Sequence, residues 1–177
     1  GCPIQCGRQT KTATGEGHGP EYETIWALGA NLGIDSLEAV VELNYLCNEL
    51  GLDTISVGGT IAAMIELAED GVLPEEAATP RRGDAPSVAA AIRALAAREG
   101  EIGDLAAQGS RALCDAYGRL GSAMQVKGLE LPAYDPRGMQ GQGLGYATSN
   151  RGGCHLRGNM LGFRSEEHTS ELQSRHN

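Results

Sequence analysis

Two cysteines near the start of the chain, Cys2 and Cys6, have the residue type and spacing for metal chemistry. Thiolates clustered near a turn are ligands for zinc or for an iron–sulfur cluster. A disulfide is the alternative, but Cys47 and Cys114 fall at core positions of predicted helices, and that mixture favours a reducing cytoplasm. Two cysteines alone leave both metal ligation and a purely structural role open.

The segment from Glu16 to Thr24 (EGHGPEYET) places three carboxylates and one histidine among glycines and a proline. Glycine allows the backbone to come close to a ligand. Glu21 and Glu23 lie near each other, and one of them can act as an acid or a base if it is buried. A solvated acidic loop explains the same composition, so spacing alone leaves both interpretations open.

Residues Asn48 to Asp53 (NELGLD) straddle the predicted end of a helix. Such an end, followed by Gly51 and Asp53, presents backbone groups and a carboxylate to a bound heterocycle. The alternative is an ordinary glycine cap, since glycine readily takes the left-handed conformation that ends a helix. The hexapeptide by itself favours the ordinary cap.

The densest run of glycines lies between Gly141 and Gly158 (GQGLGYATSNRGGCHLRG) and contains Cys154 and His155. It lacks the third glycine of the Rossmann spacing, and no predicted strand leads into it, so dinucleotide binding is not expected. A lone histidine is more often structural than catalytic. Here the small residues around His155 leave room for a large group beside it.

Helices must position these segments. Apolar residues at helical spacing predict helices over 36–50, 56–70 and 86–98, with shorter ones over 102–107 and 110–117. Asp35 and Asp84 are candidate N-caps, Pro86 suits a first turn, and Gly51 and Gly100 are expected to end helices. Residues 127–135 are expected to form an extended loop. Without a convincing alternating strand, the pattern predicts an α-rich, irregular multi-helix bundle with long glycine-rich loops.

Composition narrows the function classes. The 177 residues include 14 Lys and Arg against 23 Asp and Glu, a net charge of -9, which argues against nucleic-acid binding through a basic face. No apolar run reaches the roughly 18 residues of a membrane span, and no secretory signal opens the chain. The 26 glycines are about twice the usual share for a protein of this length.

Both ends of the sequence have unusual features. The chain opens without a methionine inside the cysteine cluster, so we expect it to begin within a longer gene and to be truncated at both ends. Residues 164–177 (RSEEHTSELQSRHN) are nearly all polar, and 164–174 match the translation of what looks like a sequencing adapter. We therefore expect residues 1–163 to be native and exclude 164–177 from functional reasoning.

Taken together, these segments resemble the helical domains 2 and 3 of the tungsten-containing aldehyde ferredoxin oxidoreductase family. The resemblance covers nearly all of residues 1–163, in order and in spacing. It is carried by CPIQC (2–6), GPEYET (19–24), residues 28–71, VKGLELPAYDPRG (126–138) and GLGYATSNRGGCHLRG (143–158).

The resemblance implies two kinds of cofactor. One is a 4Fe-4S cluster, for which Cys2 and Cys6 match the second and third cysteines of the family's ligand run. The other is tungsten, or molybdenum, held by two pterin dithiolenes. One pterin is bound in the family by an Asp-x-x-Gly-Leu-Asp motif, and no motif for the second is found in this chain. The matching residues are Asn48, Gly51, Leu52 and Asp53.

Asn48 replaces the first aspartate of that motif, which removes a charge but keeps a hydrogen-bond acceptor. The resemblance further implies that Glu23 and His155 are the acid–base groups beside the metal. Glu21 is the less favoured match to the family's glutamate. Some members bind a bridging iron at a dimer axis through Glu-x-x-His. Here Tyr45 stands where that histidine would follow Glu42, so this iron site is not expected.

The implied activity is oxidation of a small aldehyde to a carboxylic acid, with electrons passed through the cluster to ferredoxin. One alternative is a family member with a non-aldehyde substrate, such as an aromatic thioester reductase. Another is a non-catalytic iron–sulfur module, against which the presence of only two cluster cysteines argues. We expect a cytoplasmic protein that binds neither nucleic acid nor membrane, inactive as this chain alone, with a homodimer possible in the parent protein.

Overall fold

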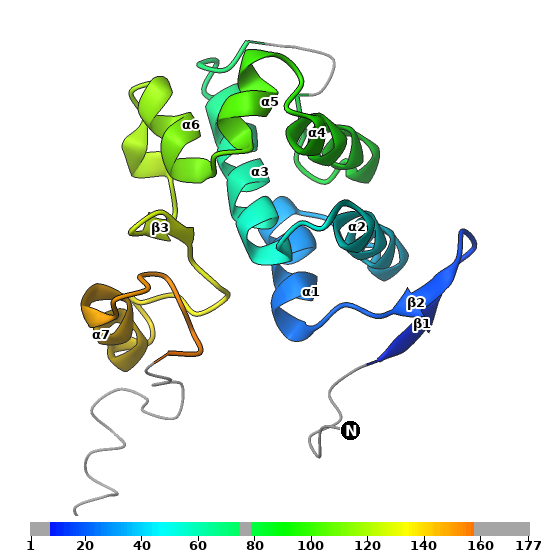
Figure 1. Ribbon diagram of the computed structural model, residues 1–177, viewed down its shortest axis with the longest axis horizontal. Helices are drawn as coiled ribbons and strands as arrows, with labels where there is room; N and C mark the ends of the chain where they lie inside the picture. The colour runs from blue at the N-terminus through cyan, green and yellow to red at the C-terminus, as the bar shows by residue number, and fades with distance from the viewer. Residues whose placement is uncertain (1–7, 75–78, 158–177) are drawn as a thin grey trace, which may run out of the picture.

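The computed structural model describes residues 8–74 and 79–157, which form an α-rich fold as the sequence predicts (Figure 1). Along the chain, the first elements are β1 (Gln9–Lys11), β2 (Glu16–His18), α1 (Tyr22–Leu28), the 3-10 turn η1 (Ala30–Leu32), α2 (Leu37–Leu50) and α3 (Thr54–Glu69). The chain continues with α4 (Ala85–Ala97), α5 (Gly100–Ala106), α6 (Ser110–Ala116), η2 (Leu120–Ser122), β3 (Gln125–Val126), β4 (Leu129–Glu130) and α7 (Gln140–Thr148).

Helix α3 is the centre of the fold. It packs against α1 and α6 and also contacts α4 and α5, and Figure 1 shows these helices arranged around it. Its side chains Ile61 and Ile65 are buried with Leu28, Ile92 and Leu113 in one continuous core. Because aromatic residues are scarce, aliphatic burial supplies most of the hydrophobic stabilisation.

Helix α2 ends where the sequence predicts but is capped by a different residue. The hydroxyl of Ser36, not the carboxylate of Asp35, accepts a hydrogen bond from the backbone N–H of Ala39 at 3.3 Å. Gly51 follows the helix with φ of 69°, the left-handed conformation that glycine adopts at low cost.

Helix α3 begins two residues earlier than predicted. The Asp53 carboxylate caps it by accepting a hydrogen bond from the N–H of Ser56 at 2.8 Å, so the helix starts at Thr54. Helix α4 ends at Ala97, and Arg98 takes the left-handed conformation with φ of 54°. Gly100 therefore does not interrupt α4 as predicted; it opens α5.

Several elements are absent from the sequence-based prediction. Helix α1 lies inside the acidic, glycine-rich segment, and α7 contains three glycines that disfavour a helix. The antiparallel pairs β1–β2 and β3–β4 have three and two residues per strand, too few for alternation to be recognised. Lys127 and Gly128, with φ of 58° and 80°, form the tight turn of the second pair, within the stretch expected to be a loop.

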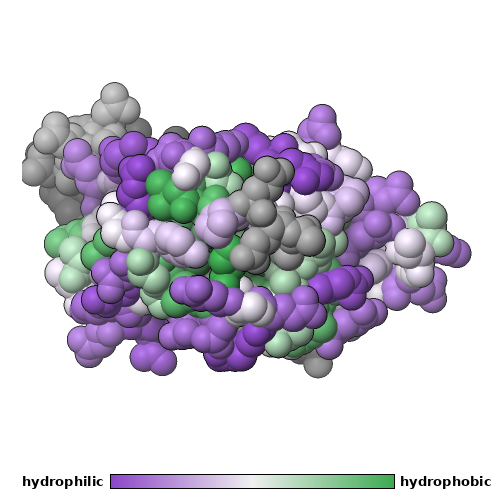
Figure 2. Space-filling model, turned by 90° about the horizontal axis from the view of Figure 1, so that it is seen from above, coloured by the Kyte–Doolittle hydropathy of each residue, from purple (hydrophilic) through white to green (hydrophobic). Residues whose placement is uncertain are grey.

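On the face shown in Figure 2, hydrophobic residues gather in the middle and hydrophilic residues surround them. Within residues 8–74 and 79–157, no single helix has the length and apolar character to cross a membrane. Helices α2 and α3 reach the required length and apolar character only when taken together, and the chain bends by 112° between them.

Candidate active site

Glu23 lies in the first turn of α1 and is buried, with 9% of its surface exposed. Its Oε2 accepts a hydrogen bond of 2.9 Å from the backbone N–H of Ala133 in the loop before α7. Its Oε1 is buried and makes no hydrogen bond of standard geometry within the described part of the chain, although the Tyr134 phenol interacts with this carboxylate. A buried acceptor without a partner costs about 1–3 kcal/mol, so such groups are exceptional and often functional. Glu21, by contrast, is exposed.

Tyr134 connects Glu23 with His155, and the sequence did not single it out. Its ring centroid lies 6.2 Å from that of Tyr22 and 5.8 Å from that of His155. Burial raises the pKa of the Tyr134 phenol, and the negative charge of the Glu23 carboxylate raises this pKa further. The only available signal was its place between Pro132 and Pro136 in the segment VKGLELPAYDPRG.

Helix α7 contacts the loop that carries Tyr134. The hydroxyl of buried Tyr146 donates a hydrogen bond of 3.1 Å to the carbonyl oxygen of Tyr134. Burial, followed by the charge of Glu23, raises the pKa of Tyr146. Both phenols stay protonated at neutral pH. The Tyr146 proton is donated to the Tyr134 carbonyl, whereas the Tyr134 phenol can donate a hydrogen bond toward a carboxylate.

The half-buried His155 lies on a loop that is pressed against the β3–β4 pair. A Cβ on Gly152 would lie 2.1 Å from the carbonyl oxygen of Val126, and one on Gly153 would lie 2.5 Å from that of Leu129. The N–H of Gly153 donates to the Val126 carbonyl oxygen at 3.2 Å. Glycine is therefore required for the contact that fixes this loop.

The residues Asn48, Gly51, Leu52 and Asp53 lie at the junction of α2 and α3, where Gly51 caps one helix and Asp53 caps the other. Asn48, Gly51 and Asp53 are exposed, and no atom lies within 4 Å of a Cβ built on Gly51. Thr24 follows Glu23 on α1, and Thr54 follows Asp53 at this junction. A hydrogen bond of 2.8 Å between the hydroxyls of Thr24 and Thr54 joins the junction to α1.

Glu42 and Tyr45, the pair considered for a bridging iron, both contact the β1–β2 hairpin. The Tyr45 hydroxyl donates to the carbonyl oxygen of Thr10 at 2.8 Å, and the Glu42 carboxylate accepts from the Thr14 hydroxyl at 3.0 Å. Tyr45 therefore has a structural role that a metal ligand at this position would have to replace.

The predicted cluster ligands Cys2 and Cys6 lie outside the described residues. Between residues 8 and 157, leaving aside 75–78, no three His, Cys, Asp or Glu residues are grouped in a way that would hold a metal ion. Cys47 and Cys114 are buried, free thiols, as their helix-core positions predict. Burial, and then the charge of Asp53, raises the pKa of Cys47 to about 12, so this thiol stays neutral.

Comparison with known proteins decides the family. The family model described as "Aldehyde ferredoxin oxidoreductase, domains 2 & 3" matches residues 1–176. The chain belongs to this family. A tungsten-containing aldehyde ferredoxin oxidoreductase of Pyrococcus furiosus is 53% identical over 165 residues, covering 90% of this chain and 27% of the relative. The enzyme of the same name from Thermococcus kodakarensis is 52% identical, with the same coverage.

A more distant relative is the "Aliphatic sulfonate oxidoreductase, WOR-like subunit" of Pyrococcus furiosus, 31% identical over 88% of this chain and 27% of the relative. The chain thus spans about a quarter of the length of the curated relatives it matches. Family membership and the α-rich fold confirm the resemblance, whereas the roles assigned to Glu23, His155, Asn48, Asp53 and the cysteines stay predictions.

Proposed function

We propose that this chain forms part of an oxidoreductase that converts aldehydes to carboxylic acids. The overall reaction takes one aldehyde and one water molecule and yields the acid, two protons and two electrons. When bound, a tungsten bis-pterin supplies the two-electron acceptor, and a 4Fe-4S cluster passes the electrons singly to ferredoxin. The rest of the proposal concerns what the residues of this chain do.

The observation that carries the proposal is the buried Oε1 of Glu23, which makes no hydrogen bond of standard geometry within the described residues and belongs to a carboxylate near the Tyr134 phenol. The hydrogen bond from Ala133 fixes one carboxylate oxygen, which leaves the other as a positioned proton acceptor. A proton leaving the attacking water or its adduct with the aldehyde would be taken at Oε1. The imidazole of His155, whose ring centroid lies 5.8 Å from that of Tyr134, is the second group that can hold a proton.

Tyr134 is the positioning residue in this scheme. Because its pKa is raised, the phenol stays protonated over the neutral range and can donate a hydrogen bond to a carboxylate or to substrate oxygen. Its carbonyl accepts a hydrogen bond from the Tyr146 hydroxyl, which holds the backbone that carries the ring next to Tyr22 and His155. This arrangement preorganises the proton acceptors before substrate binds.

The α2–α3 junction fits the edge of a pterin. Asn48 and Asp53 are exposed acceptors suited to amine and ring N–H groups, and the space beside Gly51 is open. We propose that Asn48, Gly51, Leu52 and Asp53 hold one pterin there. Cys2 and Cys6 are proposed as thiolate ligands of the iron–sulfur cluster.

The relatives favour an aldehyde over other substrates. Relatives at 52–53% identity carry the name tungsten-containing aldehyde ferredoxin oxidoreductase, whereas the sulfonate oxidoreductase subunit is 31% identical. A substrate other than an aldehyde is therefore the second candidate, and it would use the same proton acceptors.

Steady-state kinetics of the full-length protein that contains this chain test the proposal. We expect Glu23→Gln to lower kcat/KM for aldehyde oxidation, followed by viologen reduction, by about 10²–10⁴-fold, the usual contribution of a general acid or base. Glu21→Gln is the matched control, since it removes the same charge two residues away at an exposed position, and we expect a change of less than about twofold. Near-normal rates in both Glu23→Gln and His155→Gln would overturn the proposal.

A further inference from the structure

Two threonine hydroxyls join α1 to α3 at the end of the helix contact that carries the candidate site. The Oγ1 atoms of Thr24 and Thr54 lie 2.8 Å apart, and either hydroxyl can donate the hydrogen bond. Thr24 is buried, with 6% of its surface exposed, and Thr54 is half-buried. Removing one hydroxyl would therefore leave the other without its partner in a place where water has limited access.

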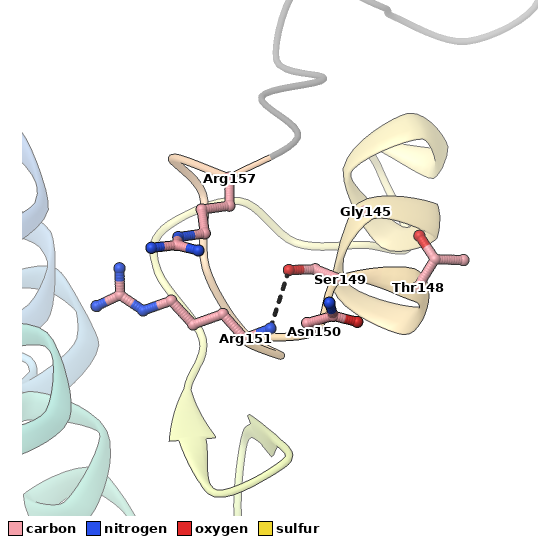
Figure 3. A pocket seen from close by; sticks show the side chains of 6 residues that line it. All are labelled: Gly145, Thr148, Ser149, Asn150, Arg151 and Arg157. Carbon is pink, nitrogen blue, oxygen red and sulfur yellow. Dashed lines mark hydrogen bonds between the residues drawn. The ribbon is translucent and has the colours of Figure 1, made fainter.

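This bond differs from the hydrogen bonds that serine and threonine hydroxyls commonly make with the backbone of their own segment. At the end of α7, for example, the Ser149 hydroxyl oxygen accepts from the N–H of Arg151 at 3.3 Å (Figure 3). The bond between Thr24 and Thr54 instead connects two helices across 30 positions of sequence. It therefore constrains tertiary packing rather than local conformation.

Each of the two threonines directly follows a residue of the candidate site. Thr24 follows Glu23 in the first turn of α1, and Thr54 follows Asp53 where α3 begins. The Glu23 carboxylate accepts the N–H of Ala133 at 2.9 Å, so a shift of the backbone at Thr24 would be passed to that bond. The hydroxyl pair thus links the candidate proton acceptor to the residues proposed to hold a pterin.

The contact between α1 and α3 continues about one turn further on in both helices. A Cβ on Gly58 would lie 2.5 Å from the carbonyl oxygen of Ala27, and the side-chain amide of Asn31 donates to the Gly58 carbonyl oxygen at 3.3 Å. Van der Waals contact limits how closely the two helices approach, whereas a hydrogen bond, with its narrow range of distance and angle, also fixes their register. The hydroxyl pair supplies such a bond at the end of α1 that carries Glu23.

We propose that Thr24 and Thr54 are positioning residues, whose hydroxyl bond sets where the Glu23 carboxylate stands relative to the α2–α3 junction. The inference rests on the proposed function, in which Glu23 accepts a proton and the junction holds one pterin. The threonines act through Glu23 and the junction, without contact to the substrate. Because a displacement of about 1 Å between reacting groups can cost about 10²-fold in rate, a bond that fixes this separation bears directly on kcat.

Replacing threonine with valine in the full-length protein that contains this chain tests the inference, because valine has nearly the same shape but no hydroxyl. We expect Thr24→Val and Thr54→Val each to lower kcat per bound tungsten by about 10-fold, with KM changed by less than about twofold. The double variant should lose no more than either single variant, because both substitutions remove the same bond. Thr24→Ser and Thr54→Ser keep the hydroxyl and should recover most of the rate.

Hydrogen exchange at the Ala133 amide is a second measurement, and it does not depend on turnover. It reports the bond from this amide to Glu23, and we expect exchange about 2–10-fold faster in both valine variants, the factor for one net hydrogen bond. Thr12→Val is the matched control. It removes one hydroxyl of the Thr12–Thr14 pair, 3.0 Å apart in the turn of the β1–β2 hairpin, and should change neither rate nor exchange.

The outcomes separate this inference from the proposed function. Normal rates, or unchanged Ala133 exchange, in both valine variants beside a slow Glu23→Gln overturn the inference alone. Losses that add in the double variant, or that persist in the serine variants, also overturn it, because the hydroxyls then do not act through their shared bond. Near-normal rates in both Glu23→Gln and His155→Gln overturn the proposed function and this inference with it. Far-UV circular dichroism checks folding, and if one valine variant unfolds, the other valine variant and its serine counterpart decide the result.

Discussion

Replacing Gly58 with alanine tests how α1, and with it Glu23, is held against the central helix. A Cβ at position 58 would lie 2.5 Å from the carbonyl oxygen of Ala27 and 2.8 Å from its carbonyl carbon and its Cβ. Ordinary van der Waals contact begins at 3.4 Å, so α1 would have to move away from α3 by about 0.9 Å, the difference between 3.4 and 2.5 Å.

The energetic cost follows from two opposing terms. Overpacking of this kind costs about 1–3 kcal/mol, whereas the better helix propensity of alanine returns at most about 1 kcal/mol. We therefore expect the free energy of unfolding to fall by about 1–2 kcal/mol, with Tm lower by about 2–4 °C for each kcal/mol. A shift of α1 alone would also change the geometry of the 2.9 Å hydrogen bond from the Ala133 N–H to Glu23, because Glu23 lies on α1.

Urea unfolding followed by far-UV circular dichroism measures this loss, and amide hydrogen exchange at Ala133 measures the broken contact. Gly121→Ala is the control, since a Cβ there meets no atom within 4 Å. We expect the control to keep or slightly raise stability, because alanine restricts the unfolded chain. If Gly58→Ala is as stable as the unmodified chain and Ala133 stays equally protected, the close α1–α3 contact does not hold Glu23.

Three further predictions concern buried or capping groups. Glu130 is 3% exposed and its Oε1 accepts from the N–H and the hydroxyl of Ser110, both at 2.8 Å, so Glu130→Ala should lower the unfolding free energy in urea by about 2–3 kcal/mol and Glu130→Gln by less. Asp53→Ala removes the cap on Ser56 and should cost about 1 kcal/mol, while Asp53→Asn retains most of it; equal losses would contradict the capping role. The pKa of Cys47 is about 12 in the folded chain, against 9.0 for an ordinary thiol. The stability that its neutral thiol contributes is therefore fully present below pH 9 and is lost by about 1.4 kcal/mol per pH unit as the pH rises toward 12. Urea unfolding between these pH values should show that the unfolding free energy falls less steeply with pH in Cys47→Ala than in the unmodified chain.

The parts of the fold that the sequence predicts are those determined by local signals. Helices α2, α3 and α4 carry apolar residues at helical spacing, and Gly51 and Pro86 mark an end and a beginning close to where the structure has them. Helix α7 opposes its own propensity with three glycines and depends on burial of Tyr146, a tertiary contact that no local pattern reveals. Short helix α1 is likewise defined by its packing on α3.

In the candidate site, too, local sequence patterns indicate some residues, whereas the contacts between distant segments appear only in the folded chain. Carboxylates among glycines drew attention to Glu23, but its anchor is the N–H of Ala133, 110 residues further along the chain. The sequence does not single out Tyr134, because a tyrosine between two prolines has no spacing that distinguishes it from an ordinary loop residue. Only the folded chain shows its ring beside His155.

Glycine has a more specific role here than close packing around a cofactor. At Gly58, Gly152 and Gly153, the atoms that a Cβ would strike belong to the backbone of this same chain. These glycines set the separation between the segments that carry the candidate acid–base groups, and so they act on a cofactor site indirectly. Gly51 differs, because the space beside it is open and lies next to the proposed pterin-binding residues. An alanine at Gly152 should therefore displace the His155 loop, whereas any effect at Gly51 would combine left-handed backbone strain with loss of ligand space.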